Sequence, residues 1–494
     1  MTNKSYSLYG KFLPRVQDFL FLILWVSALL QGHQMLSIDS DLGRHLTLGN
    51  YILENRTIPT RDLFSHTLPN QSRPPYEWLS QILFALVYRL LNLDGVILFA
   101  ATVISLTFAL IFQFANRRSG LPVTSFLITF IAAGAASIHW LPRPHIMTVL
   151  LLAIWVEQLE RLRKVQSVRL FVFPLMMLLW ANLHGGFVFG ILAWSAYFAG
   201  WLVERWQKKA GNEAGNKFLI AGFSSLIATI ITPDLWHNWE AVLNNRSSFI
   251  LSRTVETMPP QFTDPAIIPF VFLLLLTLLL FIINWKALSA SHIFLLAGLA
   301  LMSLLMARNI PLFAVASVPI LTQFMREPLS RFKAWAQIEE RMSNSGSQSL
   351  GYAIPLIIVL VAVAFFATHY QKTRNPFFQF NPQVFPVQAV NWLEDHPQQG
   401  NMFNEFNWGG YLLYRTWPRQ LVFVDSQSDF YGETPMREYE KIITAKGNWQ
   451  NLLDEYEVAW VIIPVKAPLT TMLIGSDDWE LLYQDEIAAI FKHK

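Results

Sequence analysis

Long apolar runs separated by short polar segments fill the first three quarters of the chain. The first run, 19–36, carries no charged side chain and is long enough to cross a bilayer as a helix. No small-residue cleavage site follows it, so we interpret it as an uncleaved helix and not as a signal peptide. Further runs of helical length lie near 95–116, 122–141, 146–160, 171–183, 187–203, 217–232, 267–284, 290–306, 310–324 and 353–369.

One segment leaves the number of crossings open. Residues 76–93 (YEWLSQILFALVYRLLNL) resemble a short span, and counting them as a crossing would invert every later helix. Either this segment dips into the membrane without crossing, or one later run is not a single crossing. The pattern therefore predicts a polytopic α-helical membrane protein with about 11–13 transmembrane helices.

Basic residues predict the orientation of these helices. Lys4, Lys11 and Arg15 precede the first run, which places the N-terminus in the cytoplasm. The later basic clusters then alternate with turns that face the outside, and the C-terminal segment also lies outside. The clusters assigned to the cytoplasm are 117–118, 161–169, 205–209, 286 and 326–333.

The chain changes character after Thr373. Residues 387–395 are predicted to form a short helix, and 410–414, 421–424 and 459–463 are predicted strands, with two helices between the last two. Gly409 and Gly410 are interpreted as a turn before a strand. The predicted domains are thus a transmembrane domain, 1–373, with a long first outer loop, 37–76, and an extracytoplasmic α/β domain, 374–494.

Composition supports the membrane interpretation and excludes several classes of function. Charged residues make up 14% of the chain, against roughly 25% in soluble proteins, and 53% of residues are hydrophobic. The absence of cysteine excludes disulfides, thiolate metal sites and cysteine nucleophiles. The basic residues are spread among membrane loops, so no nucleic-acid partner is expected. No Walker loop or dinucleotide fingerprint occurs, which argues against an ATP-driven pump.

Charge is divided unevenly between the two predicted domains. From Asn375 to the end the chain has 16 acidic and 8 basic side chains, a net charge of −8, and the preceding residues carry +11. A basic membrane domain keeps its charges beside the cytoplasm and anionic lipid phosphates. The acidic C-terminal domain is therefore expected outside.

Two aspartates follow the first apolar run and are the main candidates for chemistry. Asp39 and Asp41 stand where the predicted helix leaves the bilayer. One interpretation is a general base that deprotonates an incoming hydroxyl group at the outer membrane face. A second is a pair of oxygen ligands for a divalent cation, and a third is the polar start of a loop.

Other polar residues are predicted at the same outer level. A single interfacial arginine often only extends to the lipid headgroups, but several together would supply cations and donors for a phosphate or pyrophosphate. His184 precedes a break at Gly185-Gly186, and broken helices usually line a cavity. The loop that contains Glu256 either closes over a site or only connects two helices. The substrate-binding candidates are Arg44, His45, Glu77, Arg143, His145, His184, Arg308 and Asn309.

This combination resembles the GT-C superfamily of membrane glycosyltransferases, which includes protein O-mannosyltransferases and the aminoarabinose transferase of lipid A. The resemblance rests on the acidic residue after the first helix, the long outer loop and the later helices. The chain is also similar to a set of bacterial membrane proteins over nearly its whole length. The shared segments are 41–45 (DLGRH), 62–65 (DLFS), 77–79 (EWL), 143–144 (RP), 180–186 (WANLHGG), 308–311 (RNIP), 407–411 (NWGGY) and 424–425 (VD), with Gly49 and Pro59.

The resemblance implies an inverting sugar transfer at the outer face of the bacterial cytoplasmic membrane. The donor would be a polyprenyl-phosphate sugar, and the acceptor a glycan, a lipid or a protein. Asp41 takes the role of general base, with Asp39 as the competing candidate, and Arg143 and Arg308 would meet the donor phosphate. The oligosaccharyltransferase branch has a peptide-binding motif of the type Trp-Trp-Asp. The C-terminal segment of this chain has no such motif, and this absence argues against glycosylation of asparagine in proteins.

The resemblance leaves the cofactor open. Superfamily members differ in metal use, and a divalent cation such as Mg²⁺ or Mn²⁺ would need carboxylates beyond the aspartate pair. Glu77 and Glu256 are the candidates for that role.

Other functions compete with this one. A lipid-linked-glycan polymerase or ligase would use the same kind of donor. A transporter of lipid-linked glycans would show internal repeats and charges deep in its spans, whereas the polar groups here fall at helix ends. A membrane scaffold for an envelope complex would tolerate substitution of the two aspartates.

Overall fold

The computed structural model describes residues 14–38, 40–209, 211–244, 249, 255–345 and 351–494. Asp39 and the basic residues Lys4 and Lys11 lie outside these ranges. Contacts divide the chain into two compact units. Unit 1 consists of Met1–Leu30, Ile97–Ile231 and Val255–Arg374, and unit 2 of Gln31–Val96, Thr232–Thr254 and Asn375–Lys494.

This division differs from the two domains expected from the sequence. The outer loop, 37–76, and the first part of the following helix belong to the same unit as the C-terminal segment. The predicted boundary at 373–374 marks the end of unit 1, but unit 2 is assembled from three separate stretches. The membrane and extracytoplasmic roles assigned to the two domains stay predictions.

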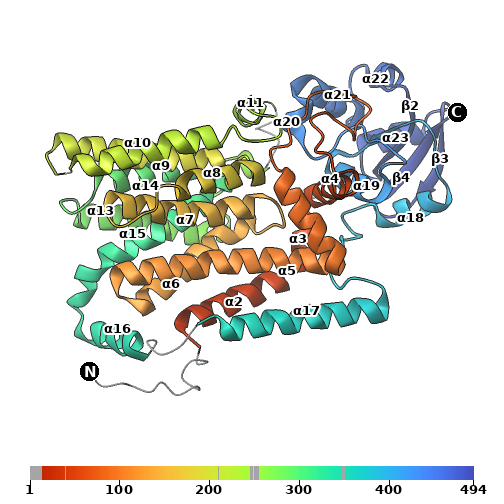
Figure 1. Ribbon diagram of the computed structural model, residues 1–494. Coiled ribbons are helices and arrows are strands. Elements are labelled where there is room, and N and C mark those ends of the chain that lie inside the picture. The colour runs from red at the N-terminus through yellow and green to blue at the C-terminus, as the bar shows by residue number, and fades with distance from the viewer. Residues whose placement is uncertain (1–13, 39, 210, 245–248, 250–254, 346–350) are drawn as a thin grey trace. The chain divides into compact units, whose positions relative to one another are not determined.

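Unit 1 is a bundle of helices that matches the predicted apolar runs (Figure 1). Its closest pairs are α9 with α14, α6 with α15, and α8 with α10. The helices are α2 (Val16–Leu30), α6 (Pro122–Ala136), α7 (His145–Arg163), α8 (Val172–Leu183), α9 (Phe187–Trp206), α10 (Asn212–Ala228), α13 (Ile268–Ile283), α14 (Ala290–Leu305), α15 (Ile310–Ser330), α16 (Lys333–Ser345) and α17 (Ala353–Thr373).

Five helical segments in the described part of the chain are long and apolar enough to cross a membrane, and a sixth is a bent pair. The pair is α2 and α3 (Gly32–Ile38), which covers the predicted first span and breaks at Gln31, next to a glycine that disfavours helix. The five are Trp78–Ser119, Pro122–His139, Phe187–Trp206, Pro265–Ile283 and Ala353–Thr373.

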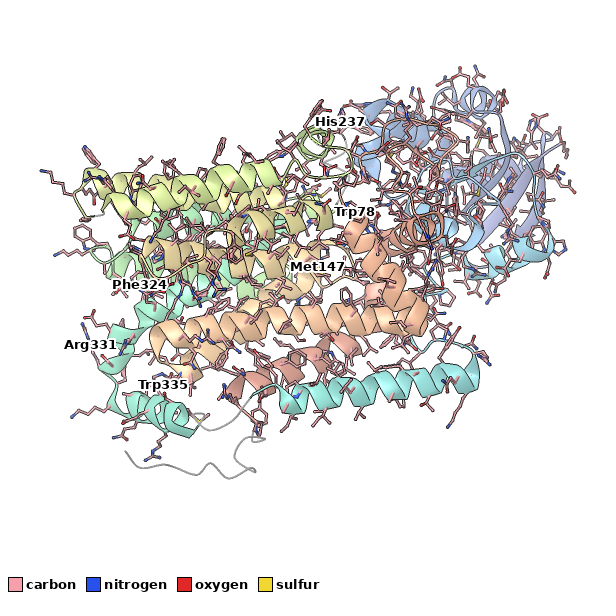
Figure 2. All side chains as sticks on the ribbon, in the orientation of Figure 1. Trp78, Met147, His237, Phe324, Arg331 and Trp335 are labelled. Atoms are coloured by element: carbon pink, nitrogen blue, oxygen red, sulfur yellow. The ribbon has the colours of Figure 1, made fainter. Side chains whose placement is uncertain are left out.

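Most of the ambiguous segment 76–93 forms the first of two helices that together make up α5 (Trp78–Ser119), whose first residue is labelled in Figure 2. Leu91 and Asn92 have non-helical backbone angles, and Asn92 has φ 56°, so α5 is kinked there. Asp94, just after the kink, is fully buried and accepts the backbone N–H groups of Phe377 and Phe378 at 2.9 and 2.8 Å. The kink explains why the sequence pattern showed two runs.

Helix α16 is amphipathic and closes one end of α6. The Glu339 carboxylate accepts the N–H groups of Val123 and Thr124, each at 2.8 Å, where the first N–H groups of α6 have no partner within the helix. Trp335, labelled in Figure 2, donates from Nε1 to the Thr124 hydroxyl at 3.1 Å. A negative charge at a helix N-terminus is also favoured by the helix dipole.

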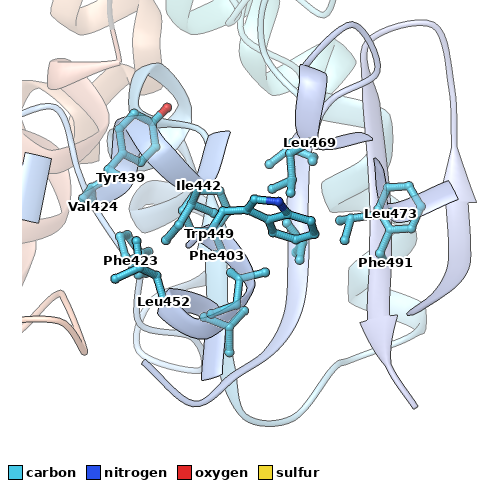
Figure 3. Close-up of a cluster of buried hydrophobic side chains, with 14 of the residues drawn as sticks. Phe403, Phe423, Val424, Tyr439, Ile442, Trp449, Leu452, Leu469, Leu473 and Phe491 are labelled. Atoms are coloured by element: carbon cyan, nitrogen blue, oxygen red, sulfur yellow. The ribbon is translucent and has the colours of Figure 1, made fainter. Parts of the chain in front are cut away.

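The C-terminal part of unit 2 is the predicted α/β fold. A four-stranded sheet has the order β1 (Asn401–Asn404), β2 (Val458–Pro464), β4 (Ala488–His493), β3 (Trp479–Gln484), with β1 and β2 parallel and the other pairs antiparallel. Six helices surround it: α18 (Val387–Asp395), α19 (Gly409–Thr416), α20 (Ser428–Tyr431), α21 (Glu433–Ile443), α22 (Trp449–Glu455) and α23 (Pro468–Ile474). Figure 3 shows part of its core, where Phe403, Phe423, Trp449 and Phe491 are buried.

Several local predictions for this segment are confirmed and two are wrong. The helix 387–395 and the strand 459–463 form as predicted, and α21 and α22 are the two expected helices, with the single turn α20 before them. Residues 410–414 are helical, not extended, because they belong to α19. Residues 421–424 form no strand of the sheet; Val422 makes one isolated bridge, to Ser65 of the outer loop.

The glycines at the start of α19 have a packing role, so their interpretation as a turn before a strand is wrong. A Cβ atom at Gly410 would lie 2.2 Å from the carbonyl oxygen of Ser40, and one at Gly43 would lie 2.2 Å from the carbonyl oxygen of Gly410. Helix α4 (Asp41–Asn55) can therefore pack backbone to backbone on α19. A third glycine, Gly49, brings α4 equally close to Gln81 of α5.

Candidate functional site

Helix α4 begins at Asp41 and gathers four of the predicted residues in unit 2. Arg44, one turn later, has a guanidinium nitrogen 3.7 Å from Asp41 and 3.9 Å from Glu77. His45 Nδ1 also lies 3.9 Å from the Glu77 carboxylate. Arg44 and His45 are 5% and 2% exposed, so this charged cluster lies inside the protein and not on its surface. Asp39, the competing aspartate, is outside the described residues.

A second buried arginine, which the sequence did not single out, lies beside this cluster. Arg73 donates to Asp62 at 2.5 Å and to Asp425 at 2.7 Å, and both carboxylates are fully buried. Its guanidinium also lies over the ring of Phe430, 4.3 Å from the centroid. Burial favours the neutral form of Arg73, but Asp425 and Asp62 outweigh it and raise its pKa, so Arg73 stays charged.

One amide joins the two arginines. The Gln427 side-chain oxygen accepts from Arg44 at 3.2 Å and from two nitrogens of Arg73 at 3.1 and 2.9 Å. The backbone N–H of Gln427 donates to Asp425 at 2.8 Å, which fixes the loop that carries this amide. The C-terminal segment therefore helps to position the arginine that stands next to Asp41.

Tyr76 and Asp429 complete the polar group. The Tyr76 hydroxyl donates to the Asp429 carboxylate at 3.3 Å and accepts from the Gln427 amide at 3.3 Å. Burial raises the pKa of the Asp429 carboxyl above its usual range, and the charges of Arg44 and Arg73 only partly offset this effect. Ionising Asp429 therefore costs folding free energy.

These side chains surround a pocket that we call the loop pocket. It is a hollow that opens to solvent, and the roughly 380 Å³ of space between its walls includes part of that opening. Among the described residues, the buried Nε atom of Arg44 has no hydrogen-bond partner. The residues that line the pocket are Arg44, Leu48, Pro59, Arg61, Leu63, Phe64, Arg73, Pro74, Pro75, Tyr76, Glu77, Gln81 and Gln427.

A second polar cluster lies in unit 1 and contains the remaining predicted residues. Arg143 donates to the Glu256 carboxylate at 2.8 Å, and His139 Nε2 lies 3.9 Å from the same carboxylate. The rings of His139 and His145 are 4.1 Å apart, and His145 Nε2 contacts the carbonyl oxygen of His139 at 2.8 Å. The turn between α6 and α7 thus holds His139 and Arg143, and His145 is the first residue of α7.

The contacts of His184 define its tautomer. Trp180 donates from Nε1 to the Thr148 hydroxyl oxygen at 2.8 Å, and the backbone N–H of Gly186 donates to His184 Nδ1 at 3.0 Å. Nδ1 is therefore an acceptor, and the Thr148 hydroxyl, 2.8 Å away, donates its proton to it. A neutral His184 then carries its proton on Nε2, which makes that nitrogen a hydrogen-bond donor.

Arg308 and Asn309 differ in their surroundings. The Asn309 side chain donates to the carbonyl oxygen of Met302 at 3.0 Å, and Asn309 directly precedes α15. Arg308 is half-buried and has neither a hydrogen bond nor an ion pair with any residue that the structure describes. Its charge acts on His139 and His184, so it belongs to the same cluster. Among the described residues, no carboxylate forms an ion pair with Arg308, so its positive charge is the uncompensated one in this cluster.

The proposed metal ligands are held by basic side chains. Glu77 lies near Arg44 and His45, and Glu256 binds Arg143. Across the described ranges, no three histidine, aspartate or glutamate side chains lie close enough to hold a metal ion. Because Asp39 is not among these residues, metal binding stays a prediction.

Sequence reasoning thus identified part of each cluster. Unit 2 brings Asp41, Arg44, His45 and Glu77 together, and unit 1 brings Arg143, His145, His184 and Arg308 together. Two of the missed residues, Asp62 and Asp425, stood in segments of the family resemblance, while Arg73 and Gln427 gave no signal in the sequence. The residues that the sequence missed are Asp62, Arg73, His139, Thr148, Asp425 and Gln427.

No family model and no curated protein matches the chain. Among solved structures, it is similar to the oligosaccharyltransferase of Archaeoglobus fulgidus in its apo form, with a TM-score of 0.62, 10% identity, and coverage of 91% of this chain and 70% of that one. The same archaeal enzyme, AglB, in complex with an inhibitory peptide and a dolichol-phosphate gives a TM-score of 0.59 and 11% identity, with the same coverage.

At this level of identity the similarity concerns the fold alone. Oligosaccharyltransferase is a GT-C glycosyltransferase, so the resemblance seen in the sequence is confirmed for the architecture of nearly the whole chain. The protein has the fold of a GT-C membrane glycosyltransferase.

Proposed function

We propose that the protein is a glycosyltransferase that takes a sugar from a polyprenyl-phosphate donor and transfers it, with inversion, to an acceptor. The reaction would take place at the outer face of a bacterial cytoplasmic membrane that the chain crosses 11–13 times, with its N-terminus in the cytoplasm and residues 374–494 outside. The observation that carries this proposal is Asp41 at the start of a buried helix, beside Arg44, in a protein with the GT-C fold.

Asp41 is proposed as the general base. Its position at the first turn of α4 lets the helix dipole stabilise the carboxylate, and Arg44 lies 3.7 Å away, beyond hydrogen-bond distance. A carboxylate held in this way can accept the proton of an acceptor hydroxyl while the oxygen attacks the anomeric carbon. The bond between that carbon and the phosphate oxygen breaks in the same step, so no covalent enzyme intermediate forms.

The cluster in unit 1 is proposed to bind the donor phosphate. Arg308 is the first choice, because Arg143 is already paired with Glu256. The Nε2–H group of His184 would add a neutral donor, and such preorganised donors stabilise the charge that develops on the leaving phosphate.

An apolar pocket beside this cluster is consistent with a lipid-linked donor. It is an open hollow lined by His139 and His145 together with apolar side chains of α5, α7 and α15, including Ile104, Phe108 and Pro311. A hydrocarbon segment gains free energy by leaving water for such a pocket. The relative AglB has been solved with a dolichol-phosphate, which is a polyprenyl phosphate of the same kind.

A donor-turnover assay tests the proposal. The purified chain in lipid nanodiscs is given a panel of polyprenyl-phosphate sugars, with candidate glycan, lipid and peptide acceptors, and release of lipid phosphate is measured. Parallel reactions with Mg²⁺, Mn²⁺ or a chelator show whether a divalent cation is needed. Asp41→Asn and Asp39→Asn are compared to identify the general base. Turnover is lost only when the aspartate that acts as the base is replaced.

The same assay separates the competing functions. Hydrolysis or transfer from one donor supports the transferase, and a product that grows by repeated units supports a polymerase. No turnover of any donor with any acceptor would overturn the proposal.

A further inference from the structure

The loop pocket has two kinds of wall. One is apolar and stiff, with Pro59, Pro74 and Pro75 beside the ring of Phe64. The other is polar and includes Arg44, Glu77 and other planar groups. Pockets of this mixed type bind a ligand by its apolar faces and fix its orientation with a few polar groups.

The polar wall offers donors and acceptors side by side. Arg44 is a donor only, Glu77 is an acceptor when ionised, and the Tyr76 hydroxyl can do both. Because Asp62 and Asp425 neutralise Arg73, that arginine adds no uncompensated charge to the pocket. Alternating donors and acceptors without a strong net charge suit a molecule with many hydroxyl groups, each of which donates and accepts.

Arg44 provides the most specific sign of a ligand. Its Nε–H is buried and has no hydrogen-bond partner among the residues described, while its printed contacts to Asp41 and Glu77 are 3.7 and 3.9 Å long. A buried donor is normally paired, because leaving it unpaired costs free energy, and more for a charged group than for a neutral one. A ligand oxygen in the loop pocket would satisfy it.

The position of the pocket argues against a peptide that binds by adding a strand to the sheet. Its lining comes from α4, the outer loop, the start of α5 and Gln427, and includes no residue of the edge strands β1 and β3, where a peptide could add as a strand.

We propose that the loop pocket binds the terminal sugar of a glycan acceptor, with Arg44 and Glu77 as its polar contacts and Gln427 as the residue that positions Arg44. This inference rests on the proposed function, since it assigns the acceptor of that reaction. It places the sugar hydroxyls next to the first turn of α4, where Asp41 stands.

Binding can be measured without turnover. Saturation-transfer NMR on the full chain in nanodiscs, without donor, is recorded with neutral disaccharides that contain glucose, galactose, mannose or N-acetylglucosamine. At least one of them is expected to bind. Arg44→Lys, which keeps the charge but loses Nε–H, should weaken binding by about tenfold or more. Arg61→Ala, at the exposed rim, should also weaken it.

Asp41→Asn distinguishes this inference from the proposed function. It should abolish turnover and leave disaccharide binding intact. If the wild type binds a sugar but turns over no donor, the proposed transferase activity is wrong and the sugar site stands. If it turns over a donor but binds no sugar, the assignment of the loop pocket is wrong. Sugar binding that survives both Arg44→Lys and Arg61→Ala would also contradict the assignment. So would binding of a hydroxyl-containing peptide when none of the sugars binds.

Discussion

Two buried arginines in unit 2 have different surroundings and should respond differently to substitution. Arg73 is enclosed by two buried carboxylates and an amide, whereas Arg44 keeps one buried N–H without a partner among the described residues. A fully compensated arginine stabilises the fold, and an incompletely satisfied one is typical of a site that awaits a ligand.

Replacing Arg73 by alanine should destabilise the protein strongly. Asp62 and Asp425 would remain buried without their cation, and such a loss costs about 3–5 kcal/mol. Thermal unfolding in detergent checks this, with the exposed Arg61→Ala as the matched control. An Arg73→Ala protein as stable as the control would show that the two carboxylates are not held by this arginine.

Asp429 should make stability depend on pH. Because burial raises the pKa of this carboxyl in the folded state, the folded form is favoured below its unfolded pKa of about 3.9 and loses that advantage as pH rises through the folded value. Asp429→Asn should therefore be more stable than the wild type at neutral pH, with no gain at acid pH. Melting curves of both proteins over a pH series measure this difference in stability. An equal gain at every pH would contradict a raised pKa of Asp429 in the folded state.

Arg308 should matter more for turnover than Arg143. Arg308→Ala removes the uncompensated cation of the cluster, and losing one charged contact to phosphate lowers kcat/KM by about 10–100-fold. Arg143→Ala should have a smaller effect, because Glu256 already engages Arg143. The control is Arg331→Ala, an exposed arginine directly after the last residue of α15, whereas Arg308 lies just before the first. An Arg308→Ala enzyme as active as this control would remove Arg308 from the donor site.

At the scale of elements, the position of Asp41 depends on glycines. Gly43 and Gly410 let α4 and α19 touch through their backbones, and Gly49 does the same for α4 and α5. Because α4 carries Asp41 and Arg44, any change in this packing moves the site.

Gly43→Ala and Gly410→Ala should each destabilise the protein by about 1–3 kcal/mol, since the added methyl group has no room. They should also reduce turnover. Gly298 in α14 is the control, because nothing lies within 4 Å of the Cβ that alanine would add there. Gly298→Ala should be neutral or slightly stabilising, and a similar loss in all three variants would argue against the packing role.

The sequence predicted the helices well and the short strands poorly, for a physical reason. Apolar runs of fifteen or more residues can hardly be anything but helix, so unit 1 follows the pattern. Short apolar runs fit either a helix or a strand, and 410–414 is helical in α19, where Gly410 lies against Ser40 at the start of α4. Residues 421–424 form no strand of the sheet, and Val422 instead pairs with Ser65 of the outer loop, a long-range contact that no local pattern shows.

The candidate site was predictable only where residues stood at predicted helix ends. Asp41 and Arg308 are of this kind. Arg73 and Gln427 lie in irregular segments that are more than 350 positions apart in sequence and contact each other only after folding. A single sequence carries no sign of such a contact.

For the whole molecule, the division into two units gives the C-terminal segment a structural role. Residues 375–494 supply Asp425, Gln427 and Gly410, which hold the outer loop and α4. A chain that ends at 374 should therefore have a loosened outer loop, in which Arg73 has lost Asp425. Limited proteolysis read by mass spectrometry should find faster cleavage between 56 and 77, and unchanged protection there would contradict this role.

The central claim is that Asp41 is the general base of a sugar transfer. The most direct test compares donor turnover by wild type, Asp41→Asn and Glu54→Gln, since Glu54 is an exposed carboxylate at the other end of the same helix. General-base catalysis contributes about 10²–10⁴-fold, so Asp41→Asn should lose that much with its fold and sugar binding intact, and Glu54→Gln should keep wild-type turnover. Equal turnover in all three proteins would contradict the claim.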